Sequence, residues 1–137
     1  MSTTNTIDII RQLRVAMRSI NVPFESATGS TVRHLLVLDA VQNGEMIQSR
    51  ISEMTGIDRT TITNIILILE QRGFVKVKTL PEDRRAKLVS ITAEGRKTLK
   101  KLKSTLENLF GPQFGMSDQK ADTLVSLLKD VAECRVS

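Results

Sequence analysis

The chain is poor in the residue types from which disulfides, metal sites and aromatic cores are built. Its 137 residues include no tryptophan, no tyrosine, four phenylalanines, one cysteine and one histidine. The single cysteine, Cys134, excludes an internal disulfide, and with the single histidine, His34, it cannot form a cysteine/histidine metal site. We therefore expect no metal, no cofactor, an aliphatic core and a reducing, cytoplasmic location.

The usual signs of an active site are also missing. No glycine-rich phosphate-binding loop is present, and the acidic pair Glu82-Asp83 lies in a predicted turn that does not fix catalytic geometry. His34 lies in an apolar segment without an acid or nucleophile near it in sequence, so we interpret it as a core or interface histidine. Cys134 lacks the activating surroundings of a reactive thiolate, and we expect it to be inert. The sequence predicts that the protein is not an enzyme.

No hydrophobic run is long enough to cross a membrane. The longest, Ile65 to Leu69, is far shorter than the roughly 20 residues that a spanning helix needs. The N-terminus is polar, so we expect no secretory or membrane segment. The length suits one domain, residues 1–137, with a core of its own.

Positive charge, in contrast, is abundant and unevenly distributed. The net charge is +5, and residues 50–103 contain 13 Lys/Arg against 6 Asp/Glu, whereas the remainder contains 7 against 9. This concentration is expected if the partner is a phosphate backbone. A solvated basic surface without a partner explains the charge alone equally well.

A helix followed by a glycine turn is predicted near the middle of the chain. Ile47, Ile51 and Met54 form the apolar stripe of this helix. Gly56 is placed to end the helix in the left-handed conformation, and Ile57 can fill the gap to the next element.

A second helix is predicted to begin at Asp58, whose side chain can cap it. Its apolar residues have the i, i+3, i+4, i+7 spacing of one helical face: Ile62, Ile65, Ile66 and Leu69. The many β-branched residues here also favour a strand, but the spacing and the cap favour a helix. The two helices and their turn predict a helix-turn-helix, whose second helix fits a major groove.

The period of the pattern changes after Gly73, which we expect to end the second helix. Residues 75–78 alternate as in a half-buried strand, and residues 87–91 can form the returning strand. Between them, residues 80–85 form a predicted turn with Pro81 at its second position. A basic hairpin directly after a helix-turn-helix is typical of a wing that reaches a minor groove.

These motifs together resemble the multiple-antibiotic-resistance regulator (MarR) family of winged-helix repressors. The resemblance is strongest between Leu35 and Leu99 and is carried by Gly56-Ile57-Asp58-Arg59-Thr60-Thr61-Ile62-Thr63, by Leu69-Glu70-Gln71-Arg72-Gly73-Phe74-Val75, and by Asp83-Arg84-Arg85 followed by Val89-Ser90-Ile91-Thr92-Ala93-Glu94-Gly95. It implies a mainly α (α+β) winged helix-turn-helix with a two-stranded wing. It also implies dimerisation through the N- and C-terminal helices and a small, often aromatic or phenolic, effector bound between the dimerisation and DNA-binding regions.

The remaining helices are expected at the two ends of the chain. Apolar stripes predict helices over 7–20, 92–110 and 117–134, and residues 21–29 are predicted to be a connector. Ser30 or Thr31 is expected to cap a further helix that ends near Gln42. We expect residues 30–92 to form the DNA-binding unit and the helices within 7–20 and 92–134 to dimerise. An intramolecular three-helix cap is the alternative.

Candidate DNA-contacting residues come from three segments. The predicted major-groove residues are Arg59, Thr60, Thr61, Thr63 and Asn64, with Asn64 suited to a bidentate contact with adenine. The predicted phosphate contacts are Ser49, Arg50, Lys76 and Lys78. By the resemblance, Arg85 is the minor-groove arginine, Asp83 steadies it and Arg84 holds the backbone beside it.

The function expected from these observations is a sequence-specific double-stranded DNA-binding transcriptional regulator. It would bind a pseudo-palindromic operator as a homodimer and repress by occupying it, with release by a small ligand. At Leu67 and Ile68 the chain departs from the family, which usually has charged residues there, and this puts base reading from Leu67 in doubt. The alternative is a winged-helix protein-interaction module in which these two residues form a contact patch.

Overall fold

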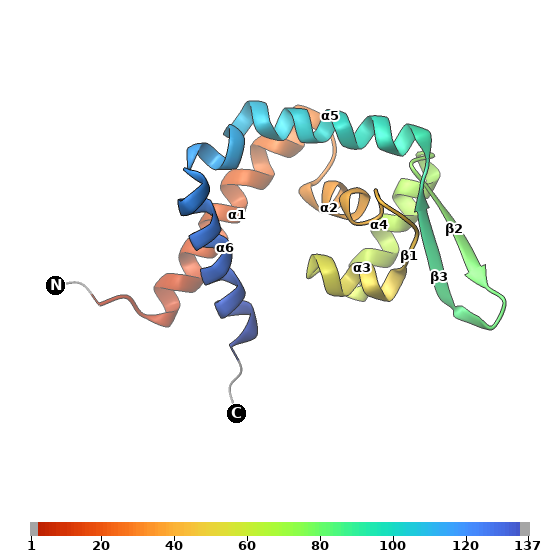
Figure 1. The fold of residues 1–137 in the computed structure, drawn as a ribbon, viewed down its shortest axis with the longest axis horizontal. Coiled ribbons are helices and arrows are strands. Elements are labelled where there is room, and N and C mark those ends of the chain that lie inside the picture. The colour runs from red at the N-terminus through yellow and green to blue at the C-terminus, as the bar shows by residue number, and fades with distance from the viewer. Residues whose placement is uncertain (1–2, 135–137) are drawn as a thin grey trace. The chain divides into compact units, whose positions relative to one another are not determined.

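The computed structural model describes residues 3–134, which form helices and one small antiparallel sheet (Figure 1). The elements in chain order are α1 (Thr6–Thr28), α2 (Val32–Ala40), β1 (Met46–Ile47), α3 (Gln48–Thr55), α4 (Arg59–Gln71), β2 (Val75–Leu80), β3 (Asp83–Ile91), α5 (Ala93–Phe110), the 3-10 helix η1 (Pro112–Gly115) and α6 (Asp118–Glu133). Two compact units result, one of residues up to Thr105 and one of residues from Leu106 onward. Among the described helices, none combines the length and the apolar character needed to cross a membrane.

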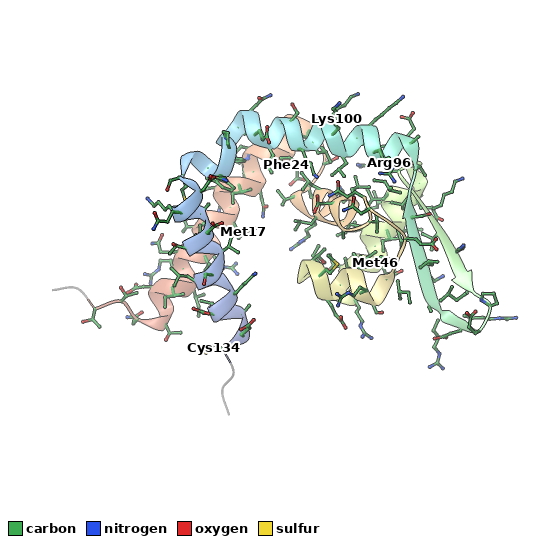
Figure 2. The ribbon with its side chains drawn as sticks, in the orientation of Figure 1. Met17, Phe24, Met46, Arg96, Lys100 and Cys134 are labelled. Carbon is green, nitrogen blue, oxygen red and sulfur yellow. The ribbon has the colours of Figure 1, made fainter. Side chains whose placement is uncertain are left out.

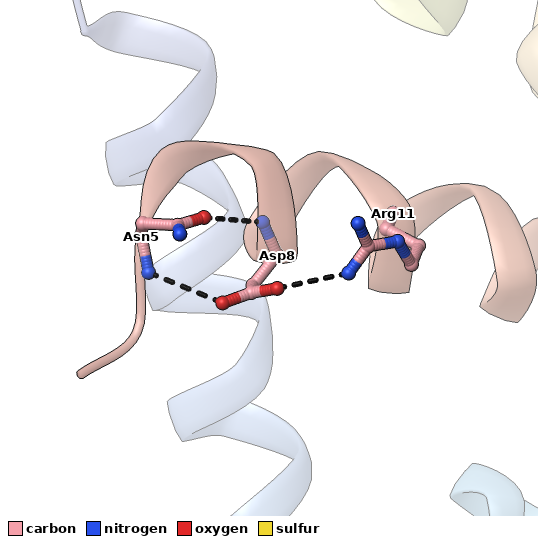
Figure 3. Close-up of polar contacts among 3 residues, drawn as sticks. All are labelled: Asn5, Asp8 and Arg11. Atoms are coloured by element: carbon pink, nitrogen blue, oxygen red, sulfur yellow. Dashed lines mark hydrogen bonds and ion pairs between the residues drawn. The ribbon is translucent and has the colours of Figure 1, made fainter. Parts of the chain in front are cut away.

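Helix α1 begins at a reciprocal cap (Figure 3). Asn5 Oδ1 accepts a hydrogen bond from the Asp8 N–H at 2.9 Å, and Asp8 Oδ2 accepts one from the Asn5 N–H at 3.5 Å. The same carboxylate pairs with Arg11 Nη1 at 2.9 Å. These bonds satisfy N–H groups that the first helical turn leaves free.

The predicted end of this helix at residue 20, and the connector over 21–29, are wrong. Helix α1 continues through Pro23 to Thr28 and ends at Gly29, whose φ of 69° is left-handed. A proline inside a helix costs about 3 kcal/mol. Burial of the following Phe24, which is fully enclosed, offsets this cost by about 1.5–3 kcal/mol.

Helix α2 supplies much of the core and holds the single histidine. Thr31 caps it, as predicted, although it ends at Ala40, before the predicted Gln42. Thr31 Oγ1 accepts from the His34 N–H, and His34 Nδ1 accepts from the Thr31 N–H, both at 3.2 Å. Burial, and secondarily the charge of Arg72, lower the pKa of His34, while Glu25 acts in the opposite direction. His34 is thus a buried, hydrogen-bonded core residue.

The first helix of the helix-turn-helix differs from its predicted stripe. Ile51 is fully buried, but Ile47 and Met54 are 38% and 55% exposed. Ile47 lies outside the helix because it belongs to β1 and pairs with Leu88 of β3. Helix α3 is short, and it turns Met54 away from the core. The predicted apolar stripe was therefore right at Ile51 and wrong at Ile47 and Met54.

The turn and the second helix follow the prediction. Gly56 ends α3 with a φ of 71°, and Ile57 is buried behind it. Asp58 caps α4, and the predicted apolar face of this helix is buried: Ile62, Ile65, Ile66 and Leu69. Helix rather than strand is therefore confirmed for this segment.

The wing starts from a tight helix end. Gly73, with a φ of 79°, donates its N–H to the Glu70 carbonyl oxygen at 3.0 Å, and Phe74 donates to that of Leu69 at 2.9 Å. This is the bonding pattern of a Schellman motif. It reverses the chain directly into β2.

The sheet contains one more strand than the predicted wing. Strands β2 and β3 pair antiparallel from Val75 with Ile91 to Thr79 with Lys87, and β1 joins the other side of β3. The pairing then jumps to Leu80 with Asp83, so residues 84–86 bulge out of β3. The returning strand is consequently longer than the predicted 87–91. The predicted fold class, a mainly α winged helix-turn-helix, is confirmed.

Helix α5 is fixed to the wing and to α2. Thr92 Oγ1 accepts from the Gly95 N–H at 3.0 Å and donates to the Gly73 carbonyl oxygen at 2.6 Å. Further along α5 lies Arg96 (Figure 2), whose Nη1 donates to the Gln42 carbonyl oxygen at 2.8 Å. Lys103 Nζ lies 2.8 Å from Asp39 Oδ1. These contacts join α5 to the start of the wing and to the C-terminal end of α2.

The second unit carries an uncovered apolar face. Ser117 caps α6, and its side chain accepts from the Lys120 N–H at 3.2 Å. The apolar stripe predicted on this helix is 41–57% exposed within the chain: Leu124, Leu127, Leu128 and Val131. Phe110 and Phe114, which precede α6 in the chain, contact each other with ring centroids 5.4 Å apart and ring planes tilted by 38°.

Candidate nucleic-acid interface

The outer face of α4 is the part of the helix-turn-helix that can enter a groove. It lies opposite the buried stripe and exposes Arg59, Thr60, Thr63, Asn64 and Leu67. Leu67 is 53% exposed. Four of the five predicted major-groove residues thus lie on one polar face, with a single leucine among them.

Thr61 lies beside this face and is engaged within the protein. Its hydroxyl donates to Asp58 Oδ1 at 2.7 Å, and its N–H donates to Asp58 Oδ2 at 3.0 Å. The Thr61 hydroxyl, followed by its N–H, lowers the pKa of the Asp58 carboxyl. Thr61 therefore stabilises the start of the helix, and its hydroxyl proton is already used.

Thr63 connects α4 to α3. Its hydroxyl donates to the Arg59 carbonyl oxygen at 3.0 Å and accepts from Gln48 Nε2 at 2.7 Å. Gln48 was not among the predicted site residues. Gln48 is the first residue of α3. The apolar pattern had placed the start of this helix one residue earlier, at Ile47, so the sequence alone did not indicate the role of Gln48.

A hollow lies between the starts of α3 and α4 and the returning wing strand. It brings together five predicted residues with four that were not predicted. The predicted residues are Ser49, Arg59, Thr63, Asp83 and Arg85; the others are Ile47, Gln48, Ala86 and Lys87. The outer face of α4 and the wing therefore border one concave surface, whose charged residues are three cations and one acid.

The wing presents its arginines from the β3 bulge. Arg84 and Arg85 are both exposed there. Asp83 Oδ1 accepts from the Arg85 backbone N–H at 3.0 Å, which fixes the chain direction at Arg85. The arginine side chains thus project from a bent, locally ordered backbone rather than from a regular strand.

The remaining predicted phosphate contacts lie outside the hollow. Arg50 pairs with Glu53 on α3 at 3.5 Å, and Lys78 lies 4.0 Å from Glu45. Lys76 is exposed on β2. All of these side chains are exposed, and pairs of this kind contribute only about 0–1 kcal/mol, so they remain available to a phosphate.

Two further features bear on ligands. Within residues 3–134, no group of three or more His, Cys, Asp or Glu side chains is arranged to hold a metal. A second hollow, of about 440 Å³, lies between the end of α1, the end of α4 and α5. Arg72 and Lys101 supply charge to it, and Phe74 and Leu102 supply apolar surface.

The comparisons with known proteins agree with this arrangement. The MarR family model matches residues 30–87. The uncharacterised HTH-type transcriptional regulator YdgJ of Bacillus subtilis is 32% identical over 101 residues, which cover 73% of this chain and 62% of YdgJ. The chain thus spans less than two thirds of that relative's length.

Solved structures match over nearly the whole chain. A MarR-family transcriptional regulator from Rhodococcus sp. RHA1 is 25% identical, with a TM-score of 0.77, and the match covers 99% of this chain and 100% of that one. CouR from Rhodococcus jostii RHA1, solved bound to p-coumaroyl-CoA, is 24% identical, with a TM-score of 0.76 and 99% of both chains covered. At this identity, the CouR match shows a shared fold.

Proposed function

The chain belongs to the MarR family, and from this premise we propose that it is a transcriptional regulator that binds a specific double-stranded DNA sequence. One observation carries the proposal: the polar face of α4 and Arg85 of the wing bulge border the same hollow. In this arrangement α4 reads base edges in a major groove and Arg85 enters the adjacent minor groove. Residues 30–92 are the DNA-binding unit in this proposal.

Within the interface, the predicted residues have separate tasks. Asn64 is the strongest candidate for a bidentate contact with adenine, and Arg59, Thr60 and Thr63 flank it. Thr61 contributes through the cap on Asp58 rather than through its hydroxyl. The predicted phosphate contacts are Ser49, Arg50, Lys76, Lys78 and Arg84, and Asp83 orients the backbone at Arg85.

The regulator acts as a homodimer in this proposal. The exposed apolar stripe of α6 and the exposed Ile7, Ile10 and Met17 of α1 need a cover that the described chain does not give them. A second copy provides it through helices within 7–20 and 92–134. Two recognition helices about 34–36 Å apart then meet successive major-groove faces of a pseudo-palindrome.

A small effector is the proposed signal for release from DNA. The hollow beside Arg72 and Lys101 joins the end of the recognition helix to α5, and its mixed lining suits an aromatic or phenolic anion. CouR, which shares the fold, was solved bound to p-coumaroyl-CoA. Thermal shift assays with aryl carboxylates test this: wild type should be stabilised, Lys101→Ala less so, and the exposed Lys97→Ala as much as wild type.

Selection of genomic DNA fragments by the purified protein tests the DNA-binding proposal. Enrichment of one pseudo-palindromic sequence is the expected result. Repression then follows if the enriched site overlaps a promoter. If no fragment is enriched while a protein is captured through Leu67 and Ile68, the protein-interaction alternative replaces it.

A further inference from the structure

Gln48 makes a directional polar contact, which a residue with only a packing role would not make. It is the first residue of α3, and its amide nitrogen donates to Thr63 Oγ1 on the face of α4 that borders the hollow. A glutamine amide carries two N–H donors. One is used by Thr63, and no other protein partner among the described residues takes the second.

Three cations surround the same hollow without a matching anion. Arg59 comes from α4, Arg85 from the β3 bulge and Lys87 from the regular part of β3. Within residues 3–134 none of the three forms an ion pair. Asp83, the acid of the hollow, has one oxygen committed to the Arg85 N–H. The concave surface therefore has an excess of positive charge that an anion would neutralise.

The position of the hollow identifies the anion. On one side lies the α4 face assigned to a major groove, and on the other lies the wing assigned to the neighbouring minor groove. In a duplex these two grooves are separated by one sugar–phosphate strand, which must therefore pass over the surface between α4 and the wing. The phosphates are the anions of that strand.

We propose that this hollow seats one backbone phosphate of the operator, and that Gln48 ties the phosphate to the base-reading surface through Thr63. The inference rests on the proposed DNA-binding function and adds two contacts, Gln48 and Lys87. Lys87 supplies charge, and the second amide N–H of Gln48 supplies a directional donor. Because Gln48 also holds Thr63, placement of this phosphate and placement of the recognition helix are set together.

Duplexes of the selected operator, each with one phosphate replaced by a neutral methylphosphonate, test the seat. With the wild-type protein, one position in each half-site should weaken binding through loss of the charge contact. With Lys87→Ala, neutralising that same phosphate should cost little. The fall in affinity between 50 and 200 mM salt should also be about tenfold smaller than for wild type, because the dimer loses roughly one phosphate contact in each half-site. Lys97→Ala on α5, outside the hollow, should keep the wild-type profile.

Two variants of Gln48 separate a phosphate contact from a packing role. Gln48→Ala removes the donor, and Gln48→Glu keeps the size but brings a negative charge to the phosphate. Gln48→Glu should bind the native operator more weakly than Gln48→Ala, and the methylphosphonate at the sensitive position should strengthen its binding. A methylphosphonate that strengthens binding instead of weakening it would not be observed if Gln48 only supported Thr63.

The outcomes distinguish this inference from the function it rests on. If the wild-type protein selects no operator, the DNA-binding proposal fails. If it selects one, but Lys87→Ala and Gln48→Glu respond to every methylphosphonate as wild type does, only the phosphate seat is overturned. Melting temperatures close to wild type in all variants are the control for folding.

Discussion

Several single side chains in this protein cap the start of a helix. Asp58 caps α4 and fixes Thr61, Thr92 caps α5 and holds the Gly73 carbonyl, and His34 closes the start of α2 from inside the core. Capping residues of this kind contribute about 1 kcal/mol each. Thr92 in addition joins two elements, because its hydroxyl bonds to the Gly73 carbonyl at the start of the wing.

His34 makes the stability of the protein depend on pH. Folding lowers its pKa below the ordinary 6.5, mainly through burial, so the unfolded chain binds the proton more tightly. The free energy of unfolding should therefore be constant above about pH 7.5 and should fall as the pH drops through 6.5. Protonation also removes the Nδ1 acceptor that the Thr31 N–H uses.

His34→Gln is the matched variant for this prediction. Glutamine at the third helical position can accept the same N–H bond but does not titrate. Urea unfolding at several pH values should show a weaker dependence between pH 7.5 and 5.5 for the variant than for wild type. Parallel curves would mean that another group causes the dependence, since this is the single histidine of the chain.

Leu67 should contribute to base preference and not to stability. With 53% of its surface exposed, Leu67→Ala should change the free energy of unfolding by less than about 0.5 kcal/mol. A thymine methyl against this leucine would make the variant lose at most roughly 1–3 kcal/mol of discrimination, at one base position. Melting curves and affinities for operator variants measure both quantities.

The neighbouring Ile66 is the control for Leu67. It is buried on the opposite face of α4, and Ile66→Ala should cost about 2–5 kcal/mol of stability. A large melting shift for Leu67→Ala with base preference unchanged would assign Leu67 to a protein contact instead.

Among the elements, the sequence predicted α4, the wing and α5 well because each carries several independent signals. Asp58, Gly73 and Thr92 mark their boundaries, and the apolar spacing is regular within α4 and along the paired part of the wing. Helix α1 was cut short because Pro23 is a local signal against helix, whereas the burial of Phe24 that outweighs it is a tertiary effect. Gln48 and Lys87 were missed for the same reason: only the folded chain brings α3 and β3 together.

The wing should contribute one arginine to minor-groove binding. Arg85 is exposed on the bulge, so Arg85→Ala should leave the fold intact and flatten the slope of log K against log salt by about one unit for each of the two wings of the dimer. It should also remove any preference for A·T-rich flanking sequence, where the narrow groove attracts arginine. Fluorescence anisotropy across a salt series measures the slope.

Arg85→Lys is informative beside the alanine variant. It keeps the charge, so the salt slope should stay close to wild type, while the A·T preference should decrease because lysine lacks the planar guanidinium. If Arg85→Ala binds as wild type does at every salt concentration, Arg85 has no role in DNA contact.

The junction of the wing and α5 depends on the absence of a side chain at Gly95. A Cβ atom there would collide with the Phe74 carbonyl and lie 2.8 Å from Ile91 Cγ1. Gly95→Ala should therefore destabilise the protein by about 1–3 kcal/mol, despite the better helix propensity of alanine.

Gly44→Ala is the matched control, because nothing lies within 4 Å of its added Cβ and its backbone is not left-handed. Its free energy of unfolding should be unchanged or slightly higher. Equal stability of the two variants would show that α5 can move away from Phe74 without loss.

At the scale of the whole molecule, the apolar surface of α6 calls for a partner. Sedimentation at micromolar concentration should give about twice the chain mass of 15.3 kDa. Leu128→Asp, in the exposed stripe, should shift the protein towards monomer and weaken binding to a duplex with two half-sites. A wild-type monomer that binds such a duplex fully would contradict the dimer.

Asp122→Asn tests the specificity of that effect. Asp122 lies away from the leucine stripe on the helical wheel of α6, so this variant should remain a dimer. If both variants dissociate equally, a general disturbance of α6 rather than loss of its apolar stripe explains the effect.

The hydrogen bonds at the base of the wing affect how the length of the wing can change during evolution. Thr92 bonds to Gly73 and Phe74, so the chain leaves the body and returns to it at the same place. The wing between Gly73 and Thr92 is therefore a loop whose two ends are held together, and lengthening such a loop adds little entropic cost. Residues can therefore be gained or lost at the Pro81-Glu82 turn without disturbing the helices. The reach of the wing along DNA is thus free to diverge while the body that carries it stays the same.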